Sequence, residues 1–277
     1  MRFFAHAFTA IAAIVPFSMA QSGTPVAYTD KDTGITFDTW TVSESLSKGG
    51  YTFGLALPSD ALTTDATEFI GYLLCSSTNA TFTGWCGVSL GGTMTDSLLL
   101  LAYPNGGDIL TSFRYTTEYH QPDVYTGNAK LTQISSTINA THYSLIFRCS
   151  NCLQWNQGGK SGNATTSAGV VNLGWAQSFA APGSPGCPSD ISLHYHDNGH
   201  NIWAATLKNA PNKSYDDWTK LPQTTVKGSC STKAVPSSTR VPSSSTRVPS
   251  SSTRVPSSST RVPSSSTRVP VSTTTPK

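Results

Sequence analysis

Two groups of residues in this chain have the chemistry needed to hold an iron ion from opposite sides. Met94 lies in the segment Ser89-Leu-Gly-Gly-Thr-Met94, and about a hundred residues later comes the cluster His194-Tyr-His196-Asp-Asn-Gly-His200. A thioether and an imidazole together are the axial ligands of haem iron in Met/His cytochromes. A plainer interpretation is that Met94 fills a gap in the core and that the histidines are polar surface residues.

The first twenty residues are predicted to be a secretory signal peptide (1–20). Arg2 supplies the positive end, residues 8–17 the apolar stretch, and Ser18-Met-Ala20 a small-residue cleavage site. No later segment is apolar over the eighteen residues that a membrane span needs. We therefore expect a secreted, extracellular protein whose mature part begins near Gln21 and contains Met94 as its one methionine. Four sequons predict N-glycosylation, at Asn79, Asn139, Asn163 and Asn212.

All six cysteines lie in the predicted mature part. An even number in an oxidising compartment predicts disulfides rather than free thiols. The order along the chain suggests the pairs Cys75–Cys86, Cys149–Cys152 and Cys187–Cys230, although other pairings are possible. Cys149-Ser-Asn-Cys152 has no second close pair to complete a zinc site, and Leu153 stands where covalent haem attachment requires histidine.

Charge and repeats divide the chain into two regions. Residues 21–232 contain fifteen acidic and ten basic residues, a mildly acidic balance that argues against a nucleic-acid function. From Lys233 onward the unit Val-Pro-Ser-Ser-Ser-Thr-Arg recurs with a period of seven. That unit cannot bury an apolar core, so residues 230–277 are predicted to form an extended, O-glycosylated linker. The sequence leaves open whether the linker carries another module.

Residues 21–229 are long enough for one sizeable domain, and their signals are mostly short strands. A single short helix is expected at 214–220, where Asp216 and Asp217 suit a helix N-terminus. Short strands without helical crossovers predict an all-β, antiparallel sandwich or barrel. The expected strands cover residues 51–57, 68–75, 84–90, 97–103, 108–116, 129–134, 142–149, 170–179 and 201–207.

The histidine cluster contains Asn198-Gly199, which is typical of a two-residue hairpin turn. Such a hairpin would place Asp197 and His200 on one face, with His194 and His196 on the other. The three histidines would then not share a zinc site, and His196 or His194 would be the candidate ligand. On the methionine side, Gly91-Gly92 would allow a flat macrocycle to approach the backbone, although the same glycines suit an ordinary turn or bulge.

Other chemistries find little support in the sequence. Nucleotide-binding glycine motifs and the Gly-x-Ser-x-Gly nucleophile elbow are absent from the sequence. Blue copper requires a free cysteine, and these cysteines are expected to be paired. Asp216-Asp217 suits a helix start better than a glycosidase site.

Several motifs, in order along the chain, are similar to a known family. They are Thr67-Glu-Phe-Ile-Gly71, Gly91-Gly-Thr-Met94, Leu98-Leu-Leu-Leu-Ala-Tyr-Pro-Asn-Gly106, Tyr119-His-Gln-Pro122, Phe147-Arg-Cys-Ser-Asn-Cys152 and Trp155-Asn-Gln-Gly-Gly159. From about residue 25 to 221 the chain resembles the haem domain of fungal cellobiose dehydrogenases. The resemblance implies an immunoglobulin-like β-sandwich with one non-covalent haem b and with Met94 and a histidine as axial ligands. His196 matches the family's histidine best, with His194 in reserve.

The same resemblance implies roles for further residues. Tyr119 and Tyr125 match tyrosines near the haem edge, where they could bind a propionate; half-buried strand aromatics are the alternative. Arg148 could also pair with a propionate, or it could be a plain surface cation. Cys149–Cys152 matches the family's disulfide.

The resemblance predicts an electron carrier rather than a sugar oxidase, because this chain contains no flavin domain. We expect a secreted, monomeric b-type cytochrome that takes electrons from a flavin dehydrogenase or a small reductant. A copper-dependent polysaccharide oxygenase, a quinone or a ferric complex would accept them. The alternative is a carbohydrate-binding module on a glycosylated stalk, with Trp155 and Trp203 exposed for sugar stacking.

Overall fold

The computed structural model describes residues 23–42, 49–78 and 81–230, all within one compact unit, Met1–Thr232. The predicted signal peptide, the Asn79 sequon and residues 231–277 of the predicted linker lie outside the described residues.

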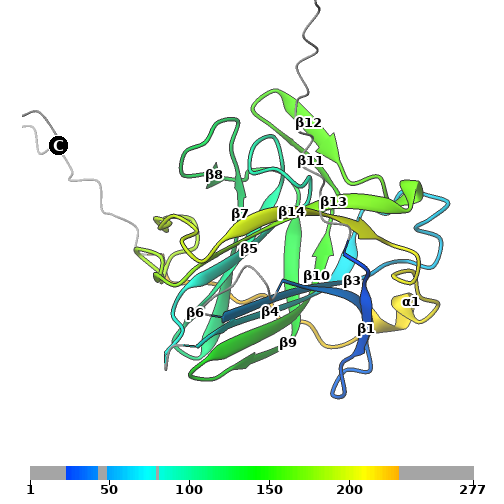
Figure 1. The fold of residues 1–277 in the computed structure, drawn as a ribbon, viewed down its shortest axis with the longest axis horizontal. Helices are drawn as coiled ribbons and strands as arrows, with labels where there is room; N and C mark the ends of the chain where they lie inside the picture. The colour runs from blue at the N-terminus through cyan, green and yellow to red at the C-terminus, as the bar shows by residue number, and fades with distance from the viewer. Residues whose placement is uncertain (1–22, 43–48, 79–80, 231–277) are drawn as a thin grey trace, which may run out of the picture. The chain divides into compact units, whose positions relative to one another are not determined.

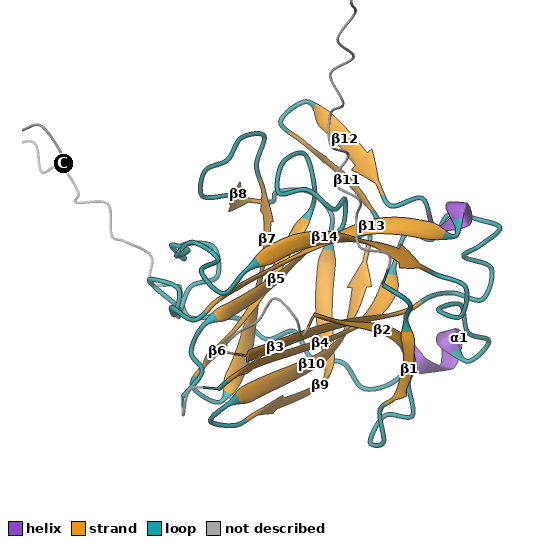
Figure 2. Ribbon diagram, viewed as in Figure 1, coloured by secondary structure: helices purple, strands orange, loops and turns teal. Residues whose placement is uncertain are grey.

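The described part of the chain is built from two six-stranded antiparallel sheets and a separate hairpin (Figure 1). The first sheet has the order β1 (Val26–Thr29), β2 (Thr36–Val42), β3 (Gly49–Ala56), β4 (Phe69–Ser77), β10 (His142–Ser150) and β9 (Lys130–Ile138). The second has the order β14 (His200–Thr206), β13 (Val170–Ser178), β5 (Trp85–Ser89), β6 (Leu99–Asn105), β7 (Asp108–Tyr115) and β8 (Asp123–Val124). The hairpin β11 (Gln154–Gln157) and β12 (Lys160–Asn163) projects at the top of the view in Figure 2. The predicted all-β, antiparallel β-sandwich is thereby confirmed.

The main core lies between the two sheets because each strand alternates its side chains between two faces. Aromatic rings from neighbouring strands meet edge to face there: Phe53 with Phe69 at 6.3 Å and Phe69 with Phe147 at 5.8 Å between ring centroids. Across the sandwich, Tyr51 of the first sheet packs against Trp175 of the second at 5.6 Å. Large buried aromatics of this kind contribute much of the hydrophobic stabilisation.

A second cluster covers the outer face of the first sheet. The short helix α1 (Tyr215–Trp218) lies there, and its Tyr215 and Trp218 are buried with Ile70 and Ile146 of β4 and β10. The helix falls inside the predicted range 214–220. Among the described residues, no helix is both long and apolar enough to cross a membrane.

The three disulfides form between the cysteines suggested by their order in the chain: Cys75–Cys86, Cys149–Cys152 and Cys187–Cys230. All nine expected strands are present with small shifts at their ends. Sequence reasoning missed β1, β2, β8, β11 and β12. Of these, β1 is mostly exposed and the β11–β12 hairpin is rich in polar residues and glycine, so neither has a clear alternation of apolar side chains.

Candidate functional site

The outer face of the second sheet brings together the two segments that carry Met94 and His196. Cross-strand partners in a sheet share a face, so the register assigns the side chains of this face to three rows. The rows are Ile202–Gly174–Ser89–Leu99, His200–Ala176–Gly87–Leu101, and Ser178–Trp85 with the pair Tyr103–Leu110. We call this surface the outer face of the second sheet throughout.

A strip of small residues crosses the middle of this face. Gly87 of β5 pairs with Ala176 of β13, and Gly174 lies one row away. A Cβ on Gly87 would approach Leu101 Cδ2 to 2.7 Å, and one on Gly174 would approach the Gly92 carbonyl oxygen to 2.2 Å. Both glycines are therefore required by close packing, and the strip carries little side-chain bulk.

The loop that connects β5 to β6 carries Met94, and we call it the Met94 loop. It lies over the first row of this face. Gly92 lies against Gly174, as the close approach of its carbonyl oxygen shows. The Ser89 hydroxyl donates to the Thr93 carbonyl at 2.6 Å. On the other side of the loop, Trp155 Nε1 donates to the Asp96 carbonyl at 2.9 Å. These contacts hold the loop on both sides of Met94, whose own side chain is half-buried.

His196 reaches the same face over the third row. Its half-buried ring lies edge-on to Trp85, with 6.5 Å between centroids and an interplanar angle of 81°. Burial, reinforced by the neighbouring His200 ring, lowers the pKa of His196, so its imidazole is neutral near pH 7. A neutral imidazole has a lone pair available for a metal.

The predicted hairpin at Asn198-Gly199 is wrong. His200 begins β14 and pairs with Ala176 of β13 rather than with Asp197. The His196 and His200 rings lie 4.0 Å apart, so they do not face opposite sides as the hairpin would require. The turn preference of Asn198-Gly199 does not decide the local structure, because the residues from His200 onward pair with β13 instead. His194 is exposed.

A zinc site is not supported. Within the described ranges, no group of three or more His, Cys, Asp or Glu side chains is arranged to hold a metal ion.

Unpaired polar atoms concentrate at the outer face of the second sheet. Among the described residues, four buried side-chain polar atoms lack a hydrogen-bond partner: Trp85 Nε1, Tyr103 OH, His196 Nδ1 and Trp203 Nε1. The first three belong to the third row or pack against it. Buried polar atoms are nearly always paired, and leaving one unpaired costs about 1–3 kcal/mol. The free His196 Nδ1 atom and the other unpaired polar atoms of this face fit a cofactor with a metal at its centre.

The two tyrosines singled out from the sequence lie in different settings. Tyr119 is 82% exposed. Tyr125 is buried, accepts a hydrogen bond from the Asn156 backbone N–H, and lies 6.5 Å from the Tyr115 ring. It also lines a hollow of about 650 Å³ whose lining does not include Met94 or His196. Contact of either tyrosine with a cofactor stays a prediction.

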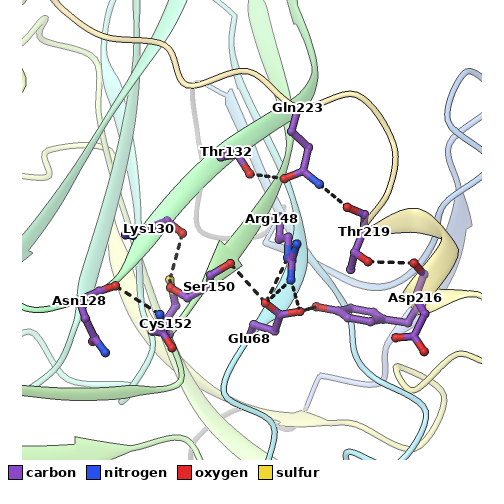
Figure 3. Close-up of polar contacts among 12 residues, drawn as sticks. Glu68, Asn128, Lys130, Thr132, Arg148, Ser150, Cys152, Asp216, Thr219 and Gln223 are labelled. Carbon is purple, nitrogen blue, oxygen red and sulfur yellow. Dashed lines mark hydrogen bonds and ion pairs between the residues drawn. The ribbon is translucent and has the colours of Figure 1, made fainter.

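Arg148 is engaged on the other sheet. Its guanidinium pairs with the Glu68 carboxylate at 2.8 Å, and Ser150 and Tyr215 donate to the same carboxylate (Figure 3). The structure therefore does not support a propionate-binding role for Arg148. Trp155 and Trp203 are each only 5% exposed. The expectation that they form an exposed sugar-stacking surface is wrong.

Sequence reasoning missed a buried arginine that holds the histidine segment. Arg114 of β7 donates to the Pro188 carbonyl at 2.6 Å, to the Pro122 carbonyl at 3.3 Å and to Ser112 Oγ at 2.9 Å. It thus connects the sheet to the segments before Asp123 and before His196. No local pattern marks the contact with the Pro188 carbonyl, because this acceptor lies 74 positions away in the sequence.

Known proteins similar to this chain include cytochrome domains of sugar dehydrogenases. Residues 28–217 match the family model described as the cytochrome domain of cellobiose dehydrogenase. The solved cytochrome domain of Myriococcum thermophilum cellobiose dehydrogenase is 54% identical, with a TM-score of 0.70, over 74% of this chain and 99% of that one. The cytochrome b domain of pyranose dehydrogenase from Coprinopsis cinerea is 31% identical, with a TM-score of 0.59, over 70% and 93% of the two chains.

A curated relative is much longer than the matched region. It is the pyrroloquinoline quinone-dependent pyranose dehydrogenase of Coprinopsis cinerea, 33% identical over 204 residues. The match covers 73% of this chain and 26% of that protein. The chain therefore spans about a quarter of the length of that curated relative.

Proposed function

The chain belongs to the family of the cellobiose dehydrogenase cytochrome domain, and from this premise we propose that it is a secreted b-type cytochrome. It carries single electrons between extracellular redox partners. In this proposal haem b is bound without a covalent link, Met94 and His196 are its axial ligands, and His194 is the reserve for the histidine position. Tyr119 and Tyr125 are kept as candidates for contact with the cofactor's edge.

One observation carries the proposal. The Met94 loop and the His196 segment come to the outer face of the second sheet from opposite sides of the same strip. The loop meets the first row at Gly174, and the histidine ring meets the third row at Trp85. The row between them contains Gly87 and Ala176. The segments of Met94 and His196 thus reach the same face of the sheet on either side of this row.

The residues of this face have separate tasks in electron transfer. Haem b with a thioether and an imidazole as axial ligands supplies reversible one-electron transfer and leaves no open coordination position for oxygen. Buried Leu99 and Leu101 limit the access of water to this face. The lowered pKa of His196 keeps its ring neutral and able to bind iron.

The proposed partners follow from the family. Relatives in which this type of domain occurs are named as cellobiose and pyranose dehydrogenases, so a sugar-oxidising dehydrogenase is the proposed donor, with small reductants as an alternative. The proposed acceptors are a copper-dependent polysaccharide oxygenase, a quinone or a ferric complex. Secretion through the 1–20 signal peptide and glycosylation at the four sequons complete the proposal.

The test compares two histidine variants of the purified full chain. The wild type is expected to be red, with a low-spin Soret band that shifts on reduction with dithionite. His196→Ala should abolish the low-spin spectrum, whereas His194→Ala should retain it because His194 is exposed. If His194→Ala instead lost the low-spin spectrum and His196→Ala kept it, His194 would be the ligand. A colourless wild type that haem cannot reconstitute would overturn the proposal.

A further inference from the structure

The turn that follows His196 is anchored by a buried pair of side-chain amides. Gln177 of β13 is fully buried, and Asn198 is 5% exposed. The Asn198 Nδ2 group donates a short hydrogen bond to Gln177 Oε1. Amides are rarely buried unless their hydrogen bonds are satisfied, so this pair is expected to have a specific structural task.

Gln177 connects the turn to both sheets. Its Nε2 group donates to the Ser76 carbonyl at 3.2 Å and approaches the Gly50 carbonyl at 3.5 Å, both on the first sheet. Its backbone N–H donates to the Gly199 carbonyl, and its carbonyl accepts from the Asn198 N–H at 3.1 Å. One residue of the second sheet thus binds the first sheet with its side chain and the histidine turn with both its side chain and backbone.

The turn is held tightly around His196 itself. The Gly199 N–H donates to the His196 carbonyl at 3.1 Å and closes the turn. The Asp197 carboxylate accepts from the Ser178 hydroxyl at 2.9 Å and from the Phe179 N–H at 3.1 Å. With Asp197 and Asn198 both anchored, the backbone of His196 has little freedom, so the position from which its ring packs against Trp85 is restrained.

We propose that Gln177 and Asn198 are positioning residues that aim the His196 imidazole at the iron. The inference rests on the proposed function and goes beyond it, because neither amide touches the ligand ring directly. Residues that orient a metal ligand typically change metal affinity 10–100-fold when they are replaced. The amide pair would therefore control how firmly the cofactor is held, and not only the stability of the fold.

The decisive variant is Asn198→Ala in the full chain. It removes the donor to Gln177 Oε1 but keeps the Gln177 bonds to Ser76 and Gly50, so the contact between the sheets is retained. The matched control is Gln133→Ala. Gln133 is another buried amide, 6% exposed, whose Nε2 donates to the Ile109 carbonyl at 2.7 Å, and it belongs to β9 of the first sheet.

Two measurements separate positioning from stability. The first is the rate of haem transfer to excess apomyoglobin, and the second is the set of low-spin g values in the electron paramagnetic resonance spectrum. Asn198→Ala should release haem about 10-fold faster or more than wild type and should change the g values. Gln133→Ala should lower the thermal midpoint, but it should leave the rate of haem transfer and the g values at the wild-type values.

A second variant at the same position keeps the proposal testable if Asn198→Ala folds poorly. Asn198→Asp keeps the size and backbone contacts of the turn but loses the donor to Gln177, so it should also release haem faster. Equal haem release and equal g values for wild type and a folded Asn198 variant would overturn the positioning role. A wild type without a low-spin spectrum would instead contradict the proposed function, so the two failures are distinguishable.

Discussion

The outer faces of the two sheets differ in how far their buried polar groups are hydrogen bonded. On the first sheet, Glu68 binds Arg148, Ser150 and Tyr215, and these contacts hold α1 against the sheet. On the second sheet, the face between the Met94 loop and His196 includes buried polar atoms that no described residue satisfies. The first face completes its own hydrogen bonding, whereas the second leaves several buried polar atoms unpaired among the described residues.

The difference follows from side-chain size as well as polarity. The first sheet's outer face is filled by Phe37, Tyr72, Tyr215 and Trp218. The second sheet has glycine and alanine at the centre of the corresponding face, with large residues such as Trp85 toward one side. The same alternation of side chains therefore places aromatic residues on the outer face of one layer and glycine and alanine at the centre of the other.

The largest expected effect comes from filling the strip of small residues. Gly174→Ala would place a methyl group 2.2 Å from the Gly92 carbonyl oxygen and force the Met94 loop away from β13. We expect the free energy of unfolding to fall by about 1–3 kcal/mol, together with weaker haem retention. Denaturant unfolding and haem titration measure both. Gly107→Ala is the control, since nothing lies within 4 Å of the added methyl group; equal losses in the two variants would contradict the close packing at Gly174.

A smaller effect, confined to stability, is expected on the first sheet. Glu68→Ala leaves Arg148 and Tyr215 without their shared partner, and we expect unfolding to become easier by about 1–2 kcal/mol. The Soret spectrum should not change, because these residues lie on the other sheet. Asp217→Ala, which removes an exposed ion pair with Lys220, should leave stability close to that of the wild type. A spectral change in Glu68→Ala would show that the two faces are coupled.

The smallest effect concerns a carboxylate without a cationic partner. Asp38 is buried in β2 and accepts a hydrogen bond from the Asn209 N–H, and burial raises its pKa above the ordinary value of an aspartate. Above that raised pKa the charged group opposes folding, and the opposition disappears as the folded protein binds a proton in mild acid. Asp38→Asn should therefore raise the thermal midpoint slightly at pH 7. The difference in thermal midpoint between this variant and the wild type should shrink toward pH 4. An advantage that grows as the pH falls would contradict this assignment.

Local patterns in the sequence were sufficient for the main strands and for the cysteine pairs. The strands β4 and β10 of the sandwich core are rich in apolar and aromatic residues, and the pairs Cys75–Cys86 and Cys149–Cys152 are close in sequence. Residue type and spacing indicate Met94 and either His194 or His196 as ligands, and the family resemblance favours His196; that these residues bind a cofactor stays a prediction.

Long-range contacts explain what could not be predicted. The Asn198-Gly199 pair indicated a hairpin, but β14 pairs with β13 and the Asn198 side chain is bound by Gln177. Arg114 acts through carbonyl groups that lie up to 74 positions away. The burial of Trp203 depends on packing against Tyr51 of the other sheet. None of these contacts has a signature within a short stretch of sequence.

The central claim is that the Met94 sulfur and the His196 ring meet a common iron on the outer face of the second sheet. The most direct test is the ferrous spectrum of purified Met94→Ala before and after addition of carbon monoxide. We predict that this variant binds carbon monoxide at once, whereas the wild type, with both axial positions filled, does not. An unchanged low-spin spectrum in Met94→Ala, with no carbon monoxide bound, would contradict the account.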